Sequence, residues 1–348
     1  MSLPSITLTG HAQKEAWQKK VLPPVEQIGR GVWSIPIPFP GNPMRYTLSY
    51  LLMGDGDAVL VDPGWESDAG MEHLTAGLRR AGLGPTDITG VVATHYHSDH
   101  LGMARRLREA SAAWVALGDR EVRRLTAAEN LHLVLHDDRE QLRFWGVPVD
   151  RLAEVAMDYS TLKHLQTLAD PDLRLKHGSL VPAKGLNLRV VTTPGHSPGH
   201  ICLIDESHGL IFSGDHVLPR ISPHIPLEIP GPPNPLADYY DSLGLIAFED
   251  EMEVCPAHEY RFIGMHRRVA QLIEHNQQRS AEVLRVVDKY GPRTIWDIAR
   301  RLTWSRGWES LQSFSLRLAL SETASHVVYL GSQGHELPGA DSLPAALR

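Results

Sequence analysis

Four side chains that commonly bind metal ions fall within six residues, in the segment from His95 to His100. His95 and His97 are two positions apart, so in an extended loop they face the same way. Asp99 and His100 turn away from them and could serve a second ion. Neutral imidazole and carboxylate groups suit zinc and other borderline divalent ions. Isolated histidines usually lie on a solvated loop, but four such groups directly after an apolar run predict a metal site.

The apolar run before this cluster, Ile88 to Ala93, predicts a short buried strand. A strand that ends in a tight loop presents its side chains at a sheet edge, where they can converge. Other candidate residues also stand at predicted strand ends. His196 is flanked by Gly and Pro on both sides, which predicts a rigid turn. Asp215 closes a predicted hairpin, and His258 ends the last predicted strand of this region.

The segment His95-x-His97-x-Asp99-His100 resembles the signature of the metallo-β-lactamase-fold hydrolases. In that family a third histidine completes the first metal site, an aspartate bridges two ions, and a last histidine completes the second site. This sequence has the matching residues in the same order: His196, Asp215 and His258. The resemblance therefore implies a first ion on three histidines, and a second on Asp99, His100 and His258, with Asp215 between them.

Two further residues are expected beside the ligands. An Asp at the place of Asp62 lies near the metal in the resembled family, so Asp62 is a candidate to orient a ligand histidine. The alternative is that Asp62 caps the helix predicted over 68–82. His216 directly follows Asp215 and is expected near the site, in a supporting or structural role. His200 has the chemistry of a ligand, but the family pattern gives it none, so it is expected to be structural.

The resemblance also narrows the reaction. Zinc β-lactamases of the family do not use a bridging aspartate at the position of Asp215, so drug hydrolysis is not expected. His97 stands where the diiron oxygen reducers carry a glutamate, which disfavours redox chemistry. Glu259 and Tyr260 resemble the glyoxalase II branch, whose members hydrolyse thioesters. The chain is thus similar to a glyoxalase II-like, lactamase-β-2-like branch of the family.

Composition sets wider limits. The chain has 348 residues, 42% of them hydrophobic and 22% charged, as in ordinary globular proteins. A net charge of −7 argues against a nucleic-acid-binding surface over the whole chain. The two cysteines, Cys202 and Cys255, lie in apolar runs and are expected to be buried and reduced. No apolar run of about 18 residues predicts a membrane span, and no signal peptide is recognised, so a cytoplasmic location is expected.

The order of predicted elements indicates an α/β fold. Short strands from about residue 27 to 61 form an antiparallel meander, and alternating helices and strands follow. Together with the resemblance this predicts an αββα metallo-β-lactamase sandwich over 25–260, after a polar, Pro-rich arm at 1–24. Residues 126–170 predict a helical insertion over the mouth of the site. The proline-rich segment 219–235 predicts an irregular loop beside the metal, with Arg220 and His224 as candidate substrate contacts.

Composition shifts again after Tyr260. Residues 261–335 predict long amphipathic helices, with a small wing at Val327 to Leu330, and resemble the winged-helix-like domain that ends a subgroup of the family. This segment carries 11 Lys and Arg against 6 Asp and Glu, so it is basic within an acidic chain. Such a domain could bind phosphates, or it could close a pocket or form a homodimer. Residues 336–348 are expected to be a loose tail.

These observations predict a dinuclear metal hydrolase, with zinc as the expected metal and iron or manganese compatible with the same ligands. A metal-bridged hydroxide, held by Asp99 as catalytic residue, would attack a small-molecule ester, thioester or lactone. One alternative is an endoribonuclease or phosphodiesterase that uses the basic C-terminal segment. A second alternative is a non-catalytic metal-binding protein, although a complete ligand set argues against it.

Overall fold

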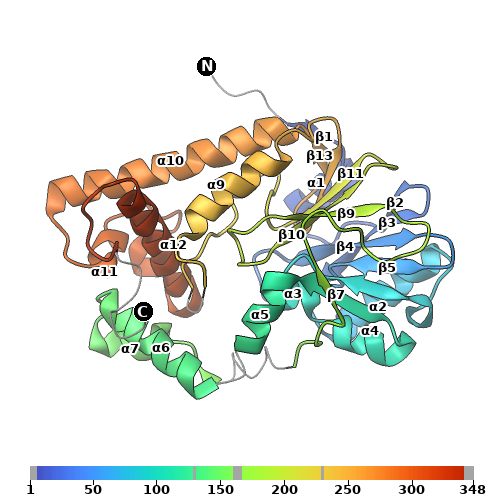
Figure 1. Ribbon diagram of the computed structural model, residues 1–348, viewed down its shortest axis with the longest axis horizontal. Helices are drawn as coiled ribbons and strands as arrows, with labels where there is room; N and C mark the ends of the chain where they lie inside the picture. Colours follow the sequence, from blue (N-terminus) through green and yellow to red (C-terminus); the bar gives the residue numbers. More distant parts are fainter. Residues whose placement is uncertain (1–5, 128–130, 160–166, 229–230, 341–348) are drawn as a thin grey trace.

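Two β-sheets face each other in the computed structural model, which describes residues 6–127, 131–159, 167–228 and 231–340 (Figure 1). The seven-stranded sheet has the order β2-β3-β4-β5-β6-β7-β8. Its strands are β2 (Glu26–Gly29), β3 (Val32–Pro38), β4 (Tyr46–Met53), β5 (Ala58–Val61), β6 (Gly90–Val92), β7 (Trp114–Gly118) and β8 (Leu173–Leu175). The six-stranded sheet has the order β1-β13-β12-β11-β10-β9. Its strands are β1 (Thr7–Leu8), β9 (Leu188–Thr192), β10 (Ile201–Asp205), β11 (Leu210–Gly214), β12 (Glu253–Pro256) and β13 (Phe262–Ile263).

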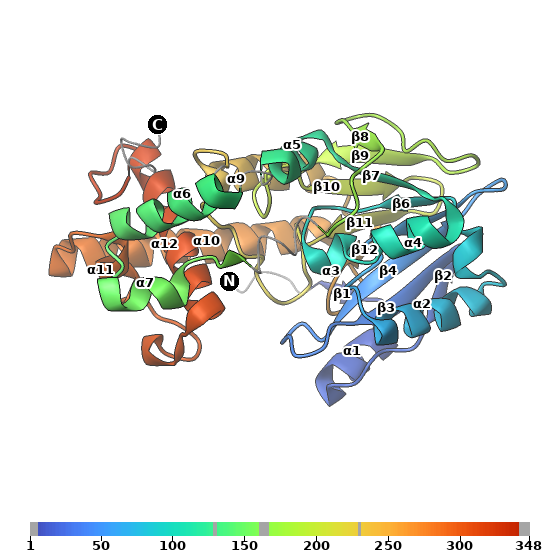
Figure 2. The ribbon, with the colours of Figure 1, turned by 90° about the horizontal axis from the view of Figure 1, so that it is seen from below.

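Apolar side chains from the inner faces of both sheets meet in one core, which includes Leu48 of β4 and Phe212 of β11. Helices cover the outer faces (Figures 1 and 2). α2 (Asp68–Arg80) and α4 (Ala104–Ser111) pack on the seven-stranded sheet through Leu74 and Leu107. α9 (Pro235–Ile246) and the first turns of α10 (Met265–Tyr290) pack on the other sheet. The predicted αββα sandwich is therefore confirmed.

The N-terminal residues are part of the sandwich. β1 pairs antiparallel with β13 and extends the six-stranded sheet. α1 (His11–Lys19) follows, and its buried Gln13 donates a hydrogen bond to Ser34 Oγ and accepts one from the backbone N–H of Arg261. The polar composition of 1–24 predicted an arm, but the described residues of this segment are held by a strand pairing and by a buried side chain.

A helical unit lies at the left of Figure 1, beside the sandwich. It combines α6 (Leu131–Phe144) and α7 (Val149–Val155) of the predicted insertion with α10, α11 (Ile295–Ala299) and α12 (Ser313–Ser332). Leu142 and Trp145 of the insertion share one apolar core with Ile298 and Leu320 from the C-terminal helices. The insertion and the C-terminal segment therefore stabilise each other; residues 128–130 and 160–166 of the insertion lie outside the described residues.

The predicted wing is wrong. Val327 to Leu330 belong to α12, and among described residues 261–340 the short β13 is the last strand. The β-branched residues of this run favour a strand, but Leu316, Leu320, Ala324 and Val327 are all buried, at helical spacing. Packing against the rest of the helical unit therefore outweighs local strand propensity. The expected C-terminal helical region is confirmed.

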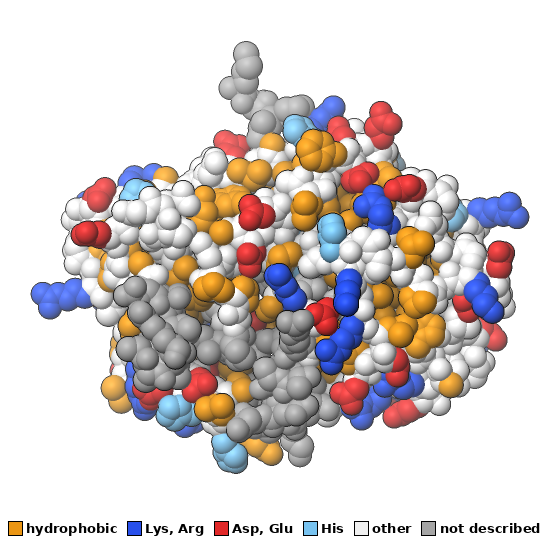
Figure 3. All heavy atoms as spheres, viewed as in Figure 1, with side chains coloured by type: hydrophobic (Ala, Val, Ile, Leu, Met, Phe, Trp, Pro, Cys, Tyr) orange, Lys and Arg blue, Asp and Glu red, His pale blue; other side chains and the backbone are white. Residues whose placement is uncertain are grey.

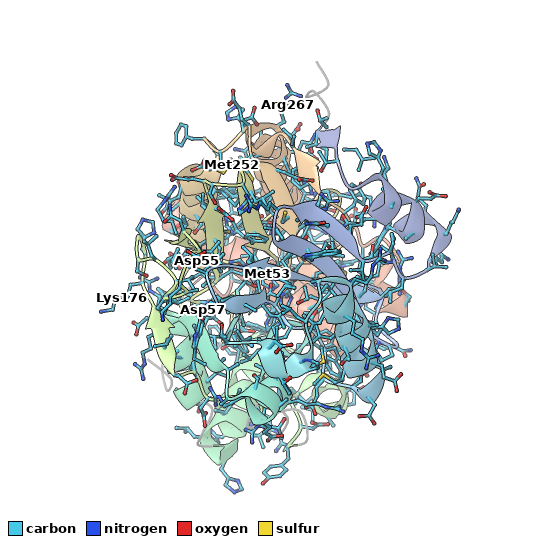
Figure 4. All side chains as sticks on the ribbon, turned by 90° about the vertical axis from the view of Figure 1, so that its right-hand side faces the viewer. Met53, Asp55, Asp57, Lys176, Met252 and Arg267 are labelled. Carbon is cyan, nitrogen blue, oxygen red and sulfur yellow. The ribbon has the colours of Figure 1, made fainter. Side chains whose placement is uncertain are left out.

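Strand ends that carry the candidate ligands lie at one end of the sandwich. β6 ends before His95, β11 ends before Asp215, and β12 ends just before His258. β4 begins at the same end with Tyr46, so its other end and the turn to β5 lie away from the candidate site. Figure 4 looks at that opposite end and shows Met53, Asp55 and Asp57 of the turn. None of the described helices is both long and apolar enough to cross a membrane.

Candidate metal centre

His95, His97 and His196 bring ring nitrogens together at the end of β6. His95 and His97 lie in the loop between β6 and the short α3 (Ser98–Leu101), while His196 lies in the β9–β10 turn. His97 Nδ1 is 2.8 Å from His95 Nε2 and 3.2 Å from His196 Nε2. These three atoms could bind one ion together. The geometry thus places the first predicted set side by side, although its members are up to about a hundred residues apart.

Asp99, His100 and His258 form a second group beside the first. His258 Nε2 lies 3.4 Å from Asp99 Oδ2, and His100 Nε2 lies 3.7 Å from the same oxygen. These ligand atoms are again close enough to one another to hold an ion. The turn of α3 separates the two groups: His97 precedes its first residue, and Asp99 and His100 lie inside it.

Asp215 lies between the two groups and reaches both. Its Oδ2 is 3.7 Å from His196 Nε2, and its Oδ1 is 3.3 Å from His258 Nε2. A register shift between Phe212 and Gly214 in the pairing with β12 precedes it. Gly214 has φ +51°, and a Cβ there would lie 2.6 Å from His200 Nε2. Glycine is therefore required for β11 to turn Asp215 into the cluster.

The ligand histidines are oriented through their other ring nitrogens. Each of four Nδ1 atoms lies within hydrogen-bond distance of an oxygen atom on a neighbouring residue. For His95, His100, His196 and His258 these oxygens belong to Thr94, Asp62, His224 and Tyr46. Donation from Nδ1 fixes the tautomer that leaves Nε2 free for a metal.

Asp62 connects two parts of the cluster. Its Oδ2 is 3.0 Å from His100 Nδ1, and its carboxylate accepts the backbone and hydroxyl hydrogen bonds of Thr94 at 2.7 and 2.9 Å. The helix predicted over 68–82 is capped by Ser67, whose hydroxyl accepts from the Gly70 N–H. The structure therefore uses Asp62 at the metal cluster and not as a helix cap.

Opposite charges dominate the second group. Burial lowers the pKa of His258, but the carboxylates of Asp215 and Asp99 have the larger effect and raise it to about 10. Burial raises the pKa of Asp99, but His100 and His258 lower it to about 2. In the first group burial and neighbouring His196 hold the pKa of His97 down, at about 4. The first group is thus neutral imidazole, which can bind a divalent cation directly, whereas the histidines of the second group carry protons that a cation would displace.

The chemistry of the donor atoms fits metal ions. His100 Nε2 and Asp215 Oδ1 are buried, and neither has a hydrogen-bond partner among the described residues. Buried polar atoms are rarely left unpaired, because each loses its bonds to water. Both atoms face the cluster of imidazoles and carboxylates, where a cation would satisfy them. The seven predicted ligands therefore fit divalent metal ions as a set.

His200 and His216 stack behind the ligands. His200 is fully buried, 5.1 Å from His95 between ring centroids, and its Nε2 accepts a hydrogen bond from the Asp215 N–H at 3.2 Å. His216 is also buried and contacts the His200 ring at 5.8 Å. Its ring nitrogens have no hydrogen-bond partner among the described residues. The structure thus places His200 in contact with Asp215 and His216 one layer further away.

Glu121 was not predicted, yet it joins two ligand loops. It is fully buried at the start of α5 (Asp119–Ala127) and accepts hydrogen bonds from Tyr96 N–H at 3.0 Å and Ser197 Oγ at 2.7 Å, and from the Gly199 N–H. Burial raises the pKa of its carboxyl to about 7, although the hydrogen bonds from Ser197, Gly199 and Tyr96 lower it. In the sequence Glu121 is one charge in a charged helix, so nothing local indicates its burial.

Replacing Glu121 by Ala is expected to lower the free energy of unfolding by about 3–5 kcal/mol, because three buried donors lose their acceptor. Glu121→Gln keeps an acceptor oxygen and should lose less. Chemical denaturation of both variants in the presence of a chelator measures this without a contribution from metal. A loss below about 1 kcal/mol for the Ala variant would contradict the assigned hydrogen bonds.

Arg220 and His224, the candidate substrate contacts, have protein partners. Arg220 Nε donates to Glu259 at 2.9 Å, and the same buried carboxylate accepts the Arg220 and Ile221 backbone N–H groups. His224 packs toward α12, with its Nε2 3.1 Å from Ser321 Oγ. Both side chains thus hold the proline-rich segment in place.

Comparison with known proteins agrees with this geometry. Residues 43–258 match the family model of the metallo-beta-lactamase superfamily. The chain is 25% identical over 312 residues to the probable metallo-hydrolase YqjP of Bacillus subtilis, covering 86% of this chain and 91% of that protein. It is 30% identical over 206 residues to the acyl-coenzyme A thioesterase MBLAC2 of Gallus gallus, covering 55% and 64%. A solved beta-lactamase domain protein from Burkholderia ambifaria superposes with a TM-score of 0.74 at 26% identity, covering 94% and 93%.

The matched region contains the two ligand groups and Asp215. The chain therefore belongs to the metallo-beta-lactamase superfamily. Relatives in this superfamily include a probable metallo-hydrolase and a thioesterase, and the His and Asp clusters of this chain suit divalent metal, so it is a metal-dependent hydrolase.

Proposed function

We propose that this hydrolase binds two divalent ions, most simply zinc, and cleaves a small-molecule acyl substrate, with a thioester favoured over an ester or lactone. Asp215 carries the dinuclear part of the proposal, because its carboxylate reaches both ligand groups. Its Oδ2 lies 3.7 Å from His196 Nε2 of the first group and 3.6 Å from His100 Nε2 of the second, and its Oδ1 lies 3.3 Å from His258 Nε2 of the second. The thioester part is supported by similarity to an acyl-coenzyme A thioesterase, of which the chain covers 64%. The ligand set of nitrogen and oxygen also accepts iron or manganese.

Two bound ions would supply a water acidic enough to lose its proton near neutral pH and would polarise the substrate carbonyl. The protein's own residues must position that water and the ligands. Asp99 has a lowered pKa of about 2 and stays ionised, so its carboxylate can accept a hydrogen bond from the attacking water. Asp215 keeps the two groups of histidines at a fixed separation. Asp62 and Thr94 keep His100 and His95 in the orientation that the cluster requires.

Cleavage of nucleic acid is less well supported. Several basic residues of the C-terminal segment pair with carboxylates: Arg279 contacts Glu282 and Glu322, Arg301 contacts Asp297, and Arg317 contacts Asp138. On the face shown in Figure 3, acidic and basic side chains are interspersed and do not gather into one basic patch. These paired residues therefore serve the packing of the helical unit, which weakens the case for a phosphate-binding surface on it.

The test combines metal analysis with a substrate panel of acyl-coenzyme A thioesters, S-acyl glutathione, lactones, aryl esters, bis-p-nitrophenyl phosphate and single-stranded RNA. We expect two ions per chain and turnover of thioesters well above that of the phosphodiesters. His97→Ala serves as the control for contaminating activity, since it removes one of the three histidines of the first group. Cleavage of only the phosphodiester or RNA would replace the proposal by its alternative, and metal binding with no turnover at all would favour a binding protein.

A further inference from the structure

The four Nδ1 contacts of the ligand histidines differ in where their oxygens come from. Those of His95, His100 and His258 are supplied by Thr94, Asp62 and Tyr46, all within the sandwich. His196 differs, because its Nδ1 lies 2.8 Å from the carbonyl oxygen of His224 in the proline-rich segment 219–235. The orientation of His196 therefore depends on what fixes that segment.

The helical unit fixes it. The His224 side chain lies against α12, with Nε2 3.1 Å from Ser321 Oγ and Nδ1 3.6 Å from Glu322 Oε2. Three residues further along, the Leu227 N–H donates to the Ser321 carbonyl at 3.2 Å. The carbonyl that receives His196 thus belongs to a residue whose ring is attached to the C-terminal helix.

Glu322 is itself held by the neighbouring helix. Its Oε1 lies 3.4 Å from Arg279 Nε of α10. Burial raises the pKa of the Glu322 carboxyl, but His224, His326 and Arg279 lower it to about 2, so it is ionised at neutral pH. An ionised carboxylate between a guanidinium and an imidazole gives a directional contact. A continuous set of contacts therefore runs from α10 through Glu322 and His224 to His196.

We infer that His224 and Glu322 are positioning residues through which the C-terminal helices raise the metal affinity of the three-histidine site, and not that of the second site. This inference rests on the proposed metal binding. If the His224 ring loses its partners, its carbonyl can shift and His196 can rotate, which weakens one ligand of the first site. The second site is unaffected, because His100 and His258 are oriented by Asp62 and Tyr46.

The variants are His224→Ala and Glu322→Gln, with Glu274→Gln as the matched control. Glu274 is exposed on α10 and contacts Gln278 of the same helix, so it tests loss of a C-terminal carboxylate without a link to His196. Zinc affinity of the full chain is measured by competition with a chelator. Cobalt absorption and cadmium NMR distinguish the three-histidine site from the site that contains Asp99.

We expect the zinc affinity of the first site to fall by about 10-fold in His224→Ala and by less in Glu322→Gln. Removing a direct hydrogen-bond partner of a metal ligand lowers affinity by about 10–100-fold, and His224 acts only through its backbone carbonyl. The second site should change by less than about twofold, as should both sites in Glu274→Gln. His224→Gln should recover part of the loss, because its amide can still bond Ser321.

Equal weakening of both sites, or no change at the first, would overturn the inference even if the wild-type protein binds two ions and hydrolyses thioesters. Failure of the proposed function gives a different result: the wild-type protein would then show fewer than two ions or no turnover. Because Glu322→Gln retains the size of the side chain, it keeps the test decisive if His224→Ala does not fold.

Discussion

Asp215→Asn is expected to reduce the metal content from two ions to one per chain and to lower turnover by at least about 1000-fold, which corresponds to about 4 kcal/mol in the transition state. In the native protein, Oδ2 lies 3.7 Å from His196 Nε2 and 3.6 Å from His100 Nε2, and Oδ1 lies 3.3 Å from His258 Nε2. Asparagine has one oxygen, and its amide N–H groups would oppose a cation. One of the two ligand groups therefore loses its shared ligand.

Metal analysis after dialysis and steady-state kinetics on the best thioester measure this effect. Asp205→Asn is a suitable control, since Asp205 is a buried aspartate in the six-stranded sheet, whose strand β11 leads to Asp215, and it binds Ser207 and His208 away from the cluster. It should lose some stability and keep both ions. If Asp215→Asn retained two ions and more than about a tenth of the activity, Asp215 would not be a bridging ligand.

Much of the candidate site could be predicted from the sequence because its ligands follow short apolar strands. His95, His97, Asp99 and His100 are adjacent in the chain, so their convergence is local. His196, Asp215 and His258 required the resemblance, because only the order of strands in two sheets brings these strand ends together. Residue types and spacing contain the chemistry, but the pairing of the strands determines the distances.

The parts that sequence reasoning missed depend on contacts between distant segments. Glu121 accepts hydrogen bonds from loops that lie 25 and 76 residues away, so no local pattern indicates its burial. The shared core of the insertion and the C-terminal helices is likewise non-local, as Trp145 packs with Ile298 and Leu320. The prediction of a wing is wrong for a related reason, because burial of α12 in this core overrides the strand propensity of its valines.

Asp62 gives the second large effect, and two substitutions separate its roles. Asp62→Ala is expected to lower the free energy of unfolding by about 3–5 kcal/mol, because the Thr94 N–H, the Thr94 hydroxyl and His100 Nδ1 lose a buried acceptor. Asp62 also has φ +51°, a conformation that Ala tolerates less well than Asp or Asn. Denaturation in the presence of chelator isolates this loss from the effect of metal.

Asp62→Asn should have little effect on stability and a large effect on binding of the second ion. Asn tolerates the backbone conformation, its oxygen can still accept from the Thr94 N–H, and the Thr94 hydroxyl can reverse to accept from the new amide. His100 Nδ1 then faces an N–H donor, so the ring is driven to the tautomer that carries its proton on Nε2. That is the nitrogen that must be free to bind the second ion.

The Asn variant should therefore fold with nearly native stability in chelator, yet bind the second ion about 10–100-fold more weakly. Chelator competition measures the affinity, and nitrogen NMR of the zinc-loaded protein reports which ring nitrogen of His100 carries a proton. Unchanged affinity with Asp62→Asn would mean that Asp62 only fills space and bonds Thr94. Equal loss of stability in both variants would contradict the expectation that the Asn oxygen still accepts from the Thr94 N–H. The expected difference between the two variants thus distinguishes control of a proton on His100 from loss of buried hydrogen bonds.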